Sequence, residues 1–435
     1  MTTEFDNTAH DQPDLARRQF LVNTAVAGGG LALGMPFMST SASAQAVASD
    51  ATEVNIWVVV KPDDTCVIRV ARSEMGQGTL TGLAQLVAEE LDCDWKKVKT
   101  EQPTPGQNLA RKRAWGDMST GGSRGIRGSH DYVRRGGAAA RIMLLQAAAN
   151  EWQVPVAELT VANGIITHSA SNRTTSYGKV ANAAAKLTPP DAKSIILKAP
   201  KDWKVAGKPM KRLDTWDKLN GSKIYSIDVR LPGMLHAAIK DCPVFGGKLV
   251  NFDDSKVLQR RGVKRVVKVD DTTVAVVADT WWRAKTALDA LPIVWDEGPN
   301  AKESSATIAV RLKDGLTASD AFADTSIGDT LKAIDGAAKK VNAVYSTPFL
   351  AHATMESMNC TVRLSPDKAE AWVPTQNGEA SLSALSTASG LPLEKCEVYK
   401  QDLGGGFGRR GGTQDYVRQA VSIAKGFPGI PVKLI

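Results

Sequence analysis

A glycine-rich stretch close to the end of the sequence has the composition of an anion-binding loop. Residues 401–412 read Gln-Asp-Leu-Gly-Gly-Gly-Phe-Gly-Arg-Arg-Gly-Gly, with glycines on both sides of Phe407. Glycine reaches left-handed backbone conformations without steric cost, so successive N–H groups of such a loop can point at one anion or one metal-bound oxygen. Two other interpretations stay open on these residues alone: a plain glycine-rich turn, or a dinucleotide-binding G-x-G-x-x-G pattern at Gly406, Gly408 and Gly411.

The elements around this loop would place it beside a second polar segment. The loop follows a predicted strand, 396–400, and precedes a predicted helix, about 413–424. Further upstream, another predicted strand ends in Thr-Gln-Asn at 375–377 and is followed by a helix. Parallel strands joined by a helix end at the same edge of a sheet, so we expect Gln376 and Phe407 to lie at one edge.

Two segments in the first third of the chain carry small and polar residues in front of helices. Residues 73–78, Ser-Glu-Met-Gly-Gln-Gly, form a predicted strand-to-helix turn before an amphipathic helix over 79–91. Residues 118–129 combine hydroxyls, glycines and two arginines before a predicted helix that runs to residue 150. Hydroxyls and N–H groups at a helix start suit a pyrophosphate. The alternatives are a glycine bend at a helix start for the first segment and a flexible linker for the second.

The two motifs near the end of the chain resemble those of a known family. Thr-Gln-Asn and Gly-Gly-Gly-Phe-Gly, followed by Pro-Val-Lys-Leu-Ile at 431–435, lie at the spacing of the molybdopterin-binding subunits of the xanthine dehydrogenase family. Met-Gly-Gln-Gly at 75–78 resembles a further motif, which here precedes the glycine loop by more than three hundred residues. That order is similar to the isoquinoline-oxidoreductase subfamily and related membrane-bound aldehyde dehydrogenases.

The resemblance implies a fold and a domain order. The fold would be of the α+β or mixed α/β class: a molybdenum cofactor-binding domain of the xanthine dehydrogenase/aldehyde oxidase type, with an inserted α/β hammerhead domain. We expect a signal peptide over 1–44 and an N-terminal segment of the cofactor-binding domain, in rearranged order, over 45–200. The hammerhead domain would cover 201–300, and the first, incomplete part of the main cofactor-binding domain 301–435.

The resemblance also implies roles for single residues. Gln376 would donate its side-chain amide to an oxo ligand of molybdenum, and the backbone N–H groups around Phe407 and Gly408 would point at another oxygen of the metal. Glu356 would support the pocket as the third member of this catalytic set, although a surface or capping glutamate is an equal alternative. No side chain would ligate the metal. Gln77 would reach the pterin, and Ser123 and Arg124 its dinucleotide part. The implied cofactor-binding residues are Gln77, Gly76, Gly78, Gly405, Gly406, Phe407, Gly408, Gln376, Ser123 and Arg124.

The N-terminal residues have the pattern of a twin-arginine export signal. Arg17 and Arg18 precede an apolar run over 22–37 and a small-residue site, Ala-Ser-Ala, at 42–44. The run is shorter than the roughly 20 residues of a spanning helix, which makes a retained anchor the weaker alternative. We therefore expect a protein in the periplasm, or peripheral at the outer face of the inner membrane.

Composition excludes several other classes. The formal net charge of +8 is spread thinly and nothing resembles a nucleic-acid motif, so we expect no nucleic-acid partner. The five cysteines contain no C-x-x-C pair and the five histidines form no cluster, so no iron–sulfur cluster and no protein-ligated metal are expected in this chain. Electrons would have to leave through a partner. The resemblance implies a small [2Fe–2S] subunit, with a membrane cytochrome as a further acceptor.

The resemblance implies an oxidoreductase of the molybdenum hydroxylase type. We expect hydroxylation of a small N-heteroaromatic substrate, isoquinoline-like, with water as the oxygen source and molybdopterin cytosine dinucleotide with molybdenum as the cofactor. Gly411 stands where purine-oxidising members carry a glutamate, which argues against a xanthine-like substrate. The family's general base, a glutamate, has no counterpart in this chain, so the chain alone is expected to be inactive. The alternatives are oxidation of an aldehyde to a carboxylic acid, and a non-catalytic cofactor scaffold or truncated fragment.

Overall fold

The structure is a computed structural model that describes residues 51–320, 322 and 324–435. The predicted export signal, 1–44, therefore lies outside the described residues. Among the helices of the described part, none is both long and apolar enough to cross a membrane. The described residues contain both helices and sheets, as the predicted mixed class requires.

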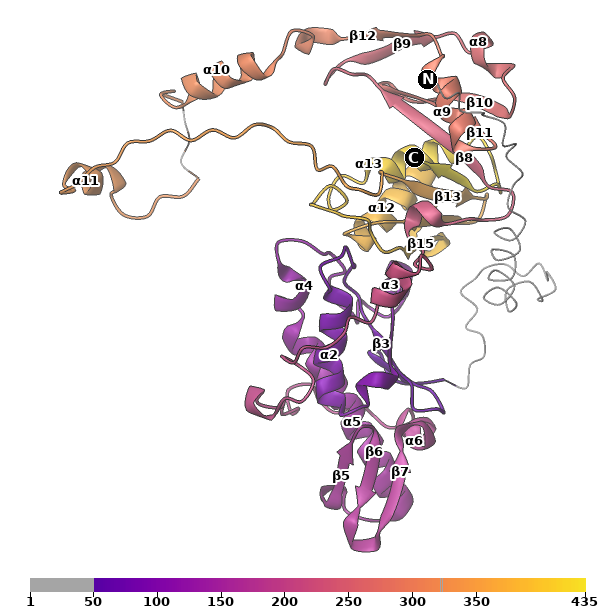
Figure 1. Cartoon of the computed structure of the whole chain (residues 1–435), viewed down its shortest axis with the longest axis vertical. Coiled ribbons are helices and arrows are strands. Elements are labelled where there is room, and N and C mark those ends of the chain that lie inside the picture. Colours follow the sequence, from indigo (N-terminus) through magenta and orange to yellow (C-terminus); the bar gives the residue numbers. More distant parts are fainter. Residues whose placement is uncertain (1–50, 321, 323) are drawn as a thin grey trace, which may run out of the picture. The chain divides into compact units, whose positions relative to one another are not determined.

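The first part of the described chain is a four-stranded sheet with two long helices (Figure 1). The strands are β1 (Thr52–Asn55), β2 (Val58–Val60), β3 (Cys66–Arg69) and β4 (Val98–Glu101). β2 and β3 pair antiparallel, whereas β3 and β4 pair parallel through the crossover helix α2 (Thr79–Leu91). The leucines predicted on one face of α2 are buried.

Helix α2 packs against α5 (His130–Trp152) at very short range. A Cβ atom on Gly137 would lie 2.4 Å from the carbonyl oxygen of Val87, so only glycine allows this approach. Between the two helices in sequence come the short helices α3 (Pro105–Ala110) and α4 (Arg124–Arg127). A three-stranded sheet and one helix follow α5: β5 (Leu159–Ala162), β6 (Ile165–His168), β7 (Arg173–Ser176) and α6 (Tyr177–Ala184).

A seven-stranded sheet, in the order β10-β11-β8-β16-β13-β14-β15, joins two regions of the chain. The first region supplies β8 (Leu235–Asp241), β10 (Val263–Asp270) and β11 (Thr273–Ala278); the second supplies β13 (Cys360–Leu364), β14 (Ala369–Val373), β15 (Cys396–Lys400) and β16 (Val432–Leu434). β16 pairs parallel with β8 and antiparallel with β13, so it connects them. Strands from the predicted hammerhead region thus share a sheet with strands from the predicted main domain.

The parallel pair expected from the sequence is present. Helix α12 (Gly378–Ser389) connects β14 to β15, which pair parallel with Val373 opposite Lys400. The helix predicted after the glycine loop is α13 (Asp415–Ala424). Both strands end at one edge, so the residues that follow them, 375–377 and 401–412, start from neighbouring positions.

The hammerhead region departs from the prediction at its start. The apolar runs of this region predict strands over 224–229, 235–239, 264–269 and 274–277. In place of the first strand the structure has a 3-10 turn over Ser226–Asp228, because the Asp228 carboxylate accepts the Tyr225 N–H and closes the turn. The strands expected over 235–239, 264–269 and 274–277 are confirmed as β8, β10 and β11. The remaining elements are α7 (Thr215–Leu219), β9 (Lys248–Phe252), α8 (Ser255–Leu258), α9 (Trp281–Asp289) and β12 (Ile293–Asp296).

The connection over residues 296–340, which the sequence predicts to be solvated, is largely exposed where the structure describes it. It contains two helices, α10 (Ser305–Gly315) and α11 (Thr330–Asp335), neither of which has a buried residue. The residues between α11 and β13 form no regular secondary structure. The buried apolar residues lie elsewhere, in separate clusters on the four-stranded sheet and on the two faces of the seven-stranded sheet.

Candidate functional site

The structure brings together the four segments that the sequence singled out. The Thr120 N–H donates to the carbonyl oxygen of Gln376 at 2.7 Å. The Ser73 hydroxyl donates to the carbonyl oxygen of Thr375 at 2.7 Å, and the Leu403 N–H to that of Glu74 at 3.0 Å. Segments more than three hundred residues apart in the sequence are therefore joined by direct hydrogen bonds.

Gln376 is the side chain that connects these segments. It directly follows β14 and is 4% exposed. Its Oε1 accepts the Gly408 N–H at 3.0 Å, and its Nε2 donates to the carbonyl oxygen of Thr120 at 2.9 Å. The second N–H of this amide donates to no residue that the structure describes, so one donor is left for a ligand. The side chain thus fixes the glycine loop to the 118–128 segment.

The glycine loop presents a run of unused backbone donors. Gly405, Phe407 and Gly408 have φ values of 99°, 52° and 90°, all in the left-handed region. The N–H groups of Gly405, Gly406 and Phe407 donate to no group within the described residues, whereas the Gly408 N–H is taken by Gln376. Consecutive N–H groups around left-handed residues form an anion-binding concavity. The predicted donors therefore lie together, but in this structure they are Gly405 to Phe407 rather than Gly408.

The loop leaves no room for a side chain at its centre. A Cβ atom on Gly406 would lie 2.4 Å from the Met75 sulfur and 2.7 Å from the Gln376 Oε1. Met75 belongs to the predicted Met-Gly-Gln-Gly turn, so the two glycine-rich motifs are in contact. The Phe407 ring, in contrast, is 70% exposed and packs little against the chain.

Glu356 and Arg410 lie on the other side of the loop. Glu356 Oε2 accepts the Gly404 N–H at 2.9 Å, and its Oε1 accepts the Ile227 N–H at 3.0 Å. The Arg410 side chain is fully buried and donates from Nε to the Gly405 carbonyl oxygen at 3.1 Å and from Nη2 to the Glu356 carbonyl oxygen. Burial lowers the pKa of the Arg410 guanidinium. These contacts hold the loop from one side, which agrees with the supporting position predicted for Glu356.

The 73–78 turn depends on Glu74, which sequence reasoning did not single out. This carboxylate is 1% exposed and accepts the N–H groups of Gly76 at 2.8 Å, Gly78 at 3.0 Å and Leu80 at 3.0 Å. Arg212 donates to the same carboxylate at 3.2 Å and to the Gly76 carbonyl oxygen at 2.7 Å. An acidic residue just ahead of a glycine turn and a helix start was the available signal, since a carboxylate can satisfy such N–H groups.

The side chain of Gln77 is folded back onto its own turn. Its Oε1 accepts the Met75 N–H at 2.6 Å and its Nε2 donates to the Ser73 carbonyl oxygen at 3.0 Å. Gly76 and Gly78 have φ values of 99° and 87°, so both need to be glycine for conformational reasons. Contact between Gln77 and a pterin stays a prediction.

Ser123 and Arg124 stand at the start of the short helix α4, and both are exposed. Ser123 adopts a φ of 56°. Arg124 makes only long hydrogen bonds, 3.4 Å from Nη2 to the Ser119 hydroxyl and 3.5 Å from Nε to the Gly121 carbonyl oxygen. The Arg124 side chain is therefore free to reorient toward a ligand. Nothing in its contacts tests the predicted role.

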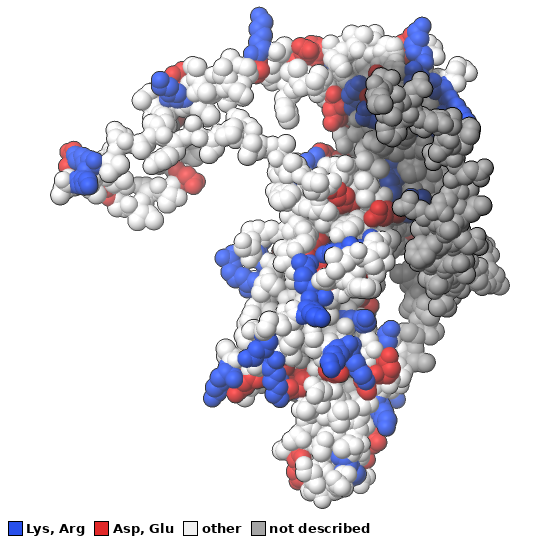
Figure 2. Space-filling model, viewed as in Figure 1, with Lys and Arg blue, Asp and Glu red and all other residues white. Residues whose placement is uncertain are grey.

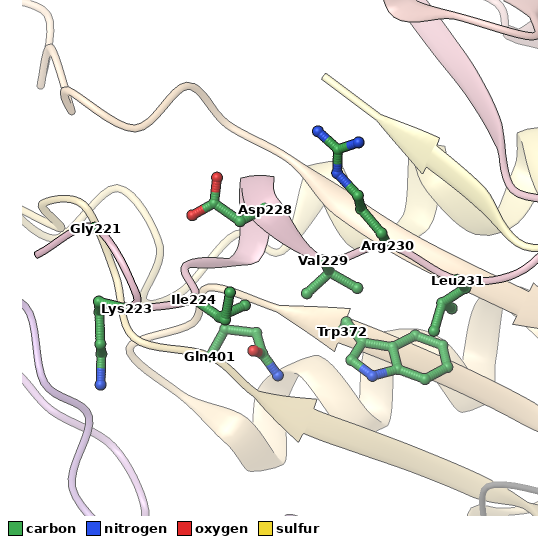
Figure 3. Close-up of a pocket in the computed structure, with 9 residues that line it drawn as sticks. All are labelled: Gly221, Lys223, Ile224, Asp228, Val229, Arg230, Leu231, Trp372 and Gln401. Atoms are coloured by element: carbon green, nitrogen blue, oxygen red, sulfur yellow. The ribbon is translucent and has the colours of Figure 1, made fainter. Parts of the chain in front are cut away.

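Two cavities lie near the glycine loop. One of about 520 Å³ is lined by residues of two of the site's four segments, among them Met75, Gly405 and Phe407, together with Arg212 and Met355. The other, of about 670 Å³, contains none of the predicted site residues. Figure 3 shows Lys223, Asp228, Arg230, Trp372 and Gln401 around it. The first cavity is the one that the 73–78 turn and the glycine loop both border.

The donor set has the chemistry of a site for a bound group that carries oxygen atoms. The described residues contain no group of three or more His, Cys, Asp or Glu side chains that could hold a metal ion. What they offer is the Gln376 amide, the three unused N–H groups of the loop and small residues that let a ligand approach closely. Donors of this kind suit an organic cofactor with phosphate or metal-bound oxygen atoms.

Comparisons with protein families identify that cofactor. Residues 8–223 match one model of a molybdopterin cofactor-binding domain, and residues 314–435 match a second model with the same description. Together the two matches contain all four segments of the site. The chain belongs to the molybdenum-binding subunits of the xanthine dehydrogenase family. The predicted fold class is thereby confirmed.

Curated relatives cover most of this chain but match it over only part of their own length. Isoquinoline 1-oxidoreductase subunit beta from Brevundimonas diminuta is 29% identical over 91% of this chain and 56% of its own. A membrane-bound aldehyde dehydrogenase, named as a pyrroloquinoline-quinone enzyme, from Gluconacetobacter polyoxogenes is also 29% identical, over 98% of this chain and 56% of its own. The chain thus spans about half the length of these relatives.

The similarity to solved structures is looser. Quinoline 2-oxidoreductase from Pseudomonas putida 86 shares 18% identity over 53% of this chain and 34% of its own, with a TM-score of 0.42. The aldehyde oxidoreductase of Desulfovibrio gigas shares 20% identity over 59% of this chain and 33% of its own, with a TM-score of 0.41.

Proposed function

We propose that this chain is the cofactor-binding part of a molybdenum-dependent oxidoreductase. The observation that carries the proposal is the buried Gln376 amide next to the unused N–H groups of Gly405, Gly406 and Phe407. When bound, molybdopterin with molybdenum would supply the two-electron oxidation of a carbon atom, with water as the source of oxygen. The residues of the chain would bind this group, orient it and exclude water from part of its surface.

Each segment of the site would contribute a separate function. The free amide N–H of Gln376 and the loop N–H groups would donate to oxygen atoms of the bound group, and Arg410 and Glu356 would hold the loop in the conformation that exposes those donors. Glu74 and Arg212 would hold the 73–78 turn in the same way. Because these donors are fixed before the cofactor binds, little ordering energy would be lost on binding.

The cytosine dinucleotide form of the cofactor fits the exposed end of the site. Ser123 and Arg124 lie at a helix start and make few contacts of their own, which suits binding of a pyrophosphate. The buried Arg72 side chain stabilises this segment, because its Nε donates to the Ser129 hydroxyl at 3.0 Å.

For the substrate we propose a small N-heteroaromatic compound, isoquinoline-like. The cavity beside the loop has an apolar lining that includes Phe407, Met75 and Met355, which suits a flat apolar ring. An aldehyde is the second candidate, since a relative named as an aldehyde dehydrogenase is as similar to this chain as the isoquinoline relative. A non-catalytic scaffold or fragment is the third, because the match covers 56% of these relatives.

Electrons would leave through a partner, for which we propose a small [2Fe–2S] subunit and then a membrane cytochrome. The relative from Brevundimonas is named as a subunit, and the five cysteines of this chain are free and far apart in sequence. The twin-arginine pattern of the N-terminal residues supports placement in the periplasm or at the outer face of the inner membrane.

The experiment that tests this function uses the complex purified from the native host. Turnover with isoquinoline and with a short aliphatic aldehyde is measured using an artificial electron acceptor, and the nucleotide released from the pterin is identified. The proposal expects faster turnover of isoquinoline, a cytosine nucleotide and ¹⁸O from labelled water in the product. Faster turnover of the aldehyde would establish the second candidate. Absence of turnover with both substrates in a fully molybdenum-loaded complex would contradict the enzyme proposal.

A further inference from the structure

Residues 341–355, which we call the exposed segment, are unlike the rest of the surface of the described chain. The segment contains no Asp, Glu, Lys or Arg, and all of its residues except Thr354 are exposed. Its large apolar side chains are almost fully accessible: Val341 85%, Val344 80%, Tyr345 90%, Phe349 79%, Leu350 83% and Met355 93%. Several large apolar side chains exposed along one short segment are typical of an interaction site.

The backbone of the exposed segment is also without partners. None of its N–H or carbonyl groups takes part in a hydrogen bond with another residue that the structure describes. Figure 1 shows it as an extended run between α11 and β13, and in Figure 2 the run is white apart from charged residues at its α11 end. An extended, uncharged run with free backbone groups is a template for pairing with another strand.

The composition of the segment sets where pairing can occur. Val341, Val344, Tyr345 and Thr347 are β-branched or aromatic residues, the types that favour strands. Pro348 has no N–H and therefore interrupts a ladder of backbone hydrogen bonds. Pairing is accordingly expected over 341–347, with Phe349 and Leu350 packing against the partner without regular pairing.

The exposed segment leads directly into the cofactor site. The next residue, Glu356, donates its N–H to the Gly404 carbonyl oxygen at 3.0 Å. A Cβ atom on Gly405 would lie 3.7 Å from the Thr354 Cα, and Met355 lines the cavity beside the loop. A polypeptide that paired with this segment would therefore be held next to the glycine loop.

We infer that the exposed segment is a docking strand for one particular occupant: a polypeptide equivalent to the part of the relatives that lies outside the match. The relatives are matched over only 56% of their length, so in those proteins a large additional stretch of chain exists. Strand addition to 341–347 would bury the apolar side chains, satisfy the free backbone groups and cover the open side of the site. The inference concerns an interface, so it stands or fails independently of the substrate.

Photo-cross-linking in the native host tests the occupant. A photo-reactive phenylalanine analogue is placed at Tyr345, with Phe245 as the control, because Phe245 is an aromatic residue that is 94% exposed outside the segment. The cross-linked peptide is identified by mass spectrometry. A peptide that aligns with the relatives outside the matched region, whether continuous with this chain or separate from it, supports the inference.

Three other outcomes overturn it: a cross-link to a second copy of residues 51–435, a cross-link to an unrelated protein such as an iron–sulfur subunit, or labelling at Tyr345 no stronger than at Phe245. In the complex we also expect the amides of 341–347 to exchange with solvent at least tenfold more slowly than in the 435-residue chain alone, as in a paired strand. Equal exchange rates would contradict strand addition even if the cross-link is found.

A substitution separates docking from folding. Tyr345→Asp places a charge where the proposed partner would cover it, at a residue that is 90% exposed in this chain. We expect at least a tenfold loss of the co-purified partner polypeptide, while the circular dichroism of the 435-residue chain stays unchanged. Undiminished co-purification would overturn the inference, and Phe245→Asp serves as the matched control.

Discussion

At the scale of single residues, Gln376 is the most consequential side chain of the site. Its amide makes one buried hydrogen bond, to the Thr120 carbonyl oxygen, and one part-buried hydrogen bond, to the Gly408 N–H. Gln376→Ala removes both bonds and leaves the buried Thr120 carbonyl oxygen unsatisfied, which costs about 1–3 kcal/mol. We expect a lower free energy of unfolding, measured in urea, and a complex with little molybdenum.

The matched control for this substitution is Gln146→Ala. Gln146 bonds to Asn150 on the same helix and lies outside the four segments of the site. We expect the control to change the free energy of unfolding by less than about 0.5 kcal/mol and to leave the molybdenum content unchanged. Equal effects of the two substitutions would show that Gln376 has no special role.

Lys400 makes the free energy of unfolding of the chain depend on pH. This residue ends β15, is 9% exposed and donates to the Ala71 carbonyl oxygen at 2.6 Å. Burial, with a smaller contribution from the positive charge of Arg72, lowers the pKa of Lys400 from 10.5 to about 7. Between these two values the unfolded chain binds more protons than the folded chain, so this group makes stability rise with pH, by up to about 1.4 kcal/mol per unit.

Lys400→Met removes that contribution. We compare the free energy of unfolding of the variant minus that of the wild type at two pH values. This difference is expected to be larger at about pH 7.5 than at about pH 9.5. Lys395→Met, at the exposed position immediately before β15, should show no such change. A difference that is independent of pH would contradict a lowered pKa for Lys400.

At the scale of elements, the glycine loop is set by what surrounds it as much as by its own residues. Gly406 is confined by the Met75 sulfur and the Gln376 Oε1, so Gly406→Ala would force one of them to move. Met75 is flexible, but Gln376 is held by two hydrogen bonds, and we expect a cost of about 1–3 kcal/mol. Gly412→Ala in the same loop meets nothing within 4 Å and should be tolerated.

The readout for this pair is the unfolding free energy of each variant together with its molybdenum content. We expect Gly406→Ala to lose cofactor and Gly412→Ala to retain it. If both variants retained the cofactor to the level of the wild type, close packing of the two glycine motifs would not matter for binding.

The comparison of sequence with structure is clearest at this scale. The parallel pair β14 and β15, the helices α12 and α13 and the meeting of Gln376 with the glycine loop were predictable, because strand and helix periodicity determine where such segments end. Glu74, Arg212 and the supporting position of Arg410 were not, because their partners lie on other segments and depend on tertiary packing. The turn at Ser226–Asp228 was mistaken for a strand for the same reason.

At the scale of the whole molecule, the site lies where distant parts of the chain meet. The 73–78 and 118–128 segments come from the first part of the described chain, whereas 375–377 and 401–412 come from the last. The seven-stranded sheet also contains strands from the middle of the chain, because β16, near residue 435, pairs with β8, which begins at Leu235.

The central claim is that these segments bind molybdopterin, and elemental and cofactor analysis tests it most directly. We would measure molybdenum and released pterin in the complex purified from the native host, with the Gly406→Ala complex beside it. We predict about one molybdenum and one pterin per chain in the wild type and a clear loss in the variant. A wild-type complex without molybdenum or pterin, or one that carries a quinone instead, would contradict the account.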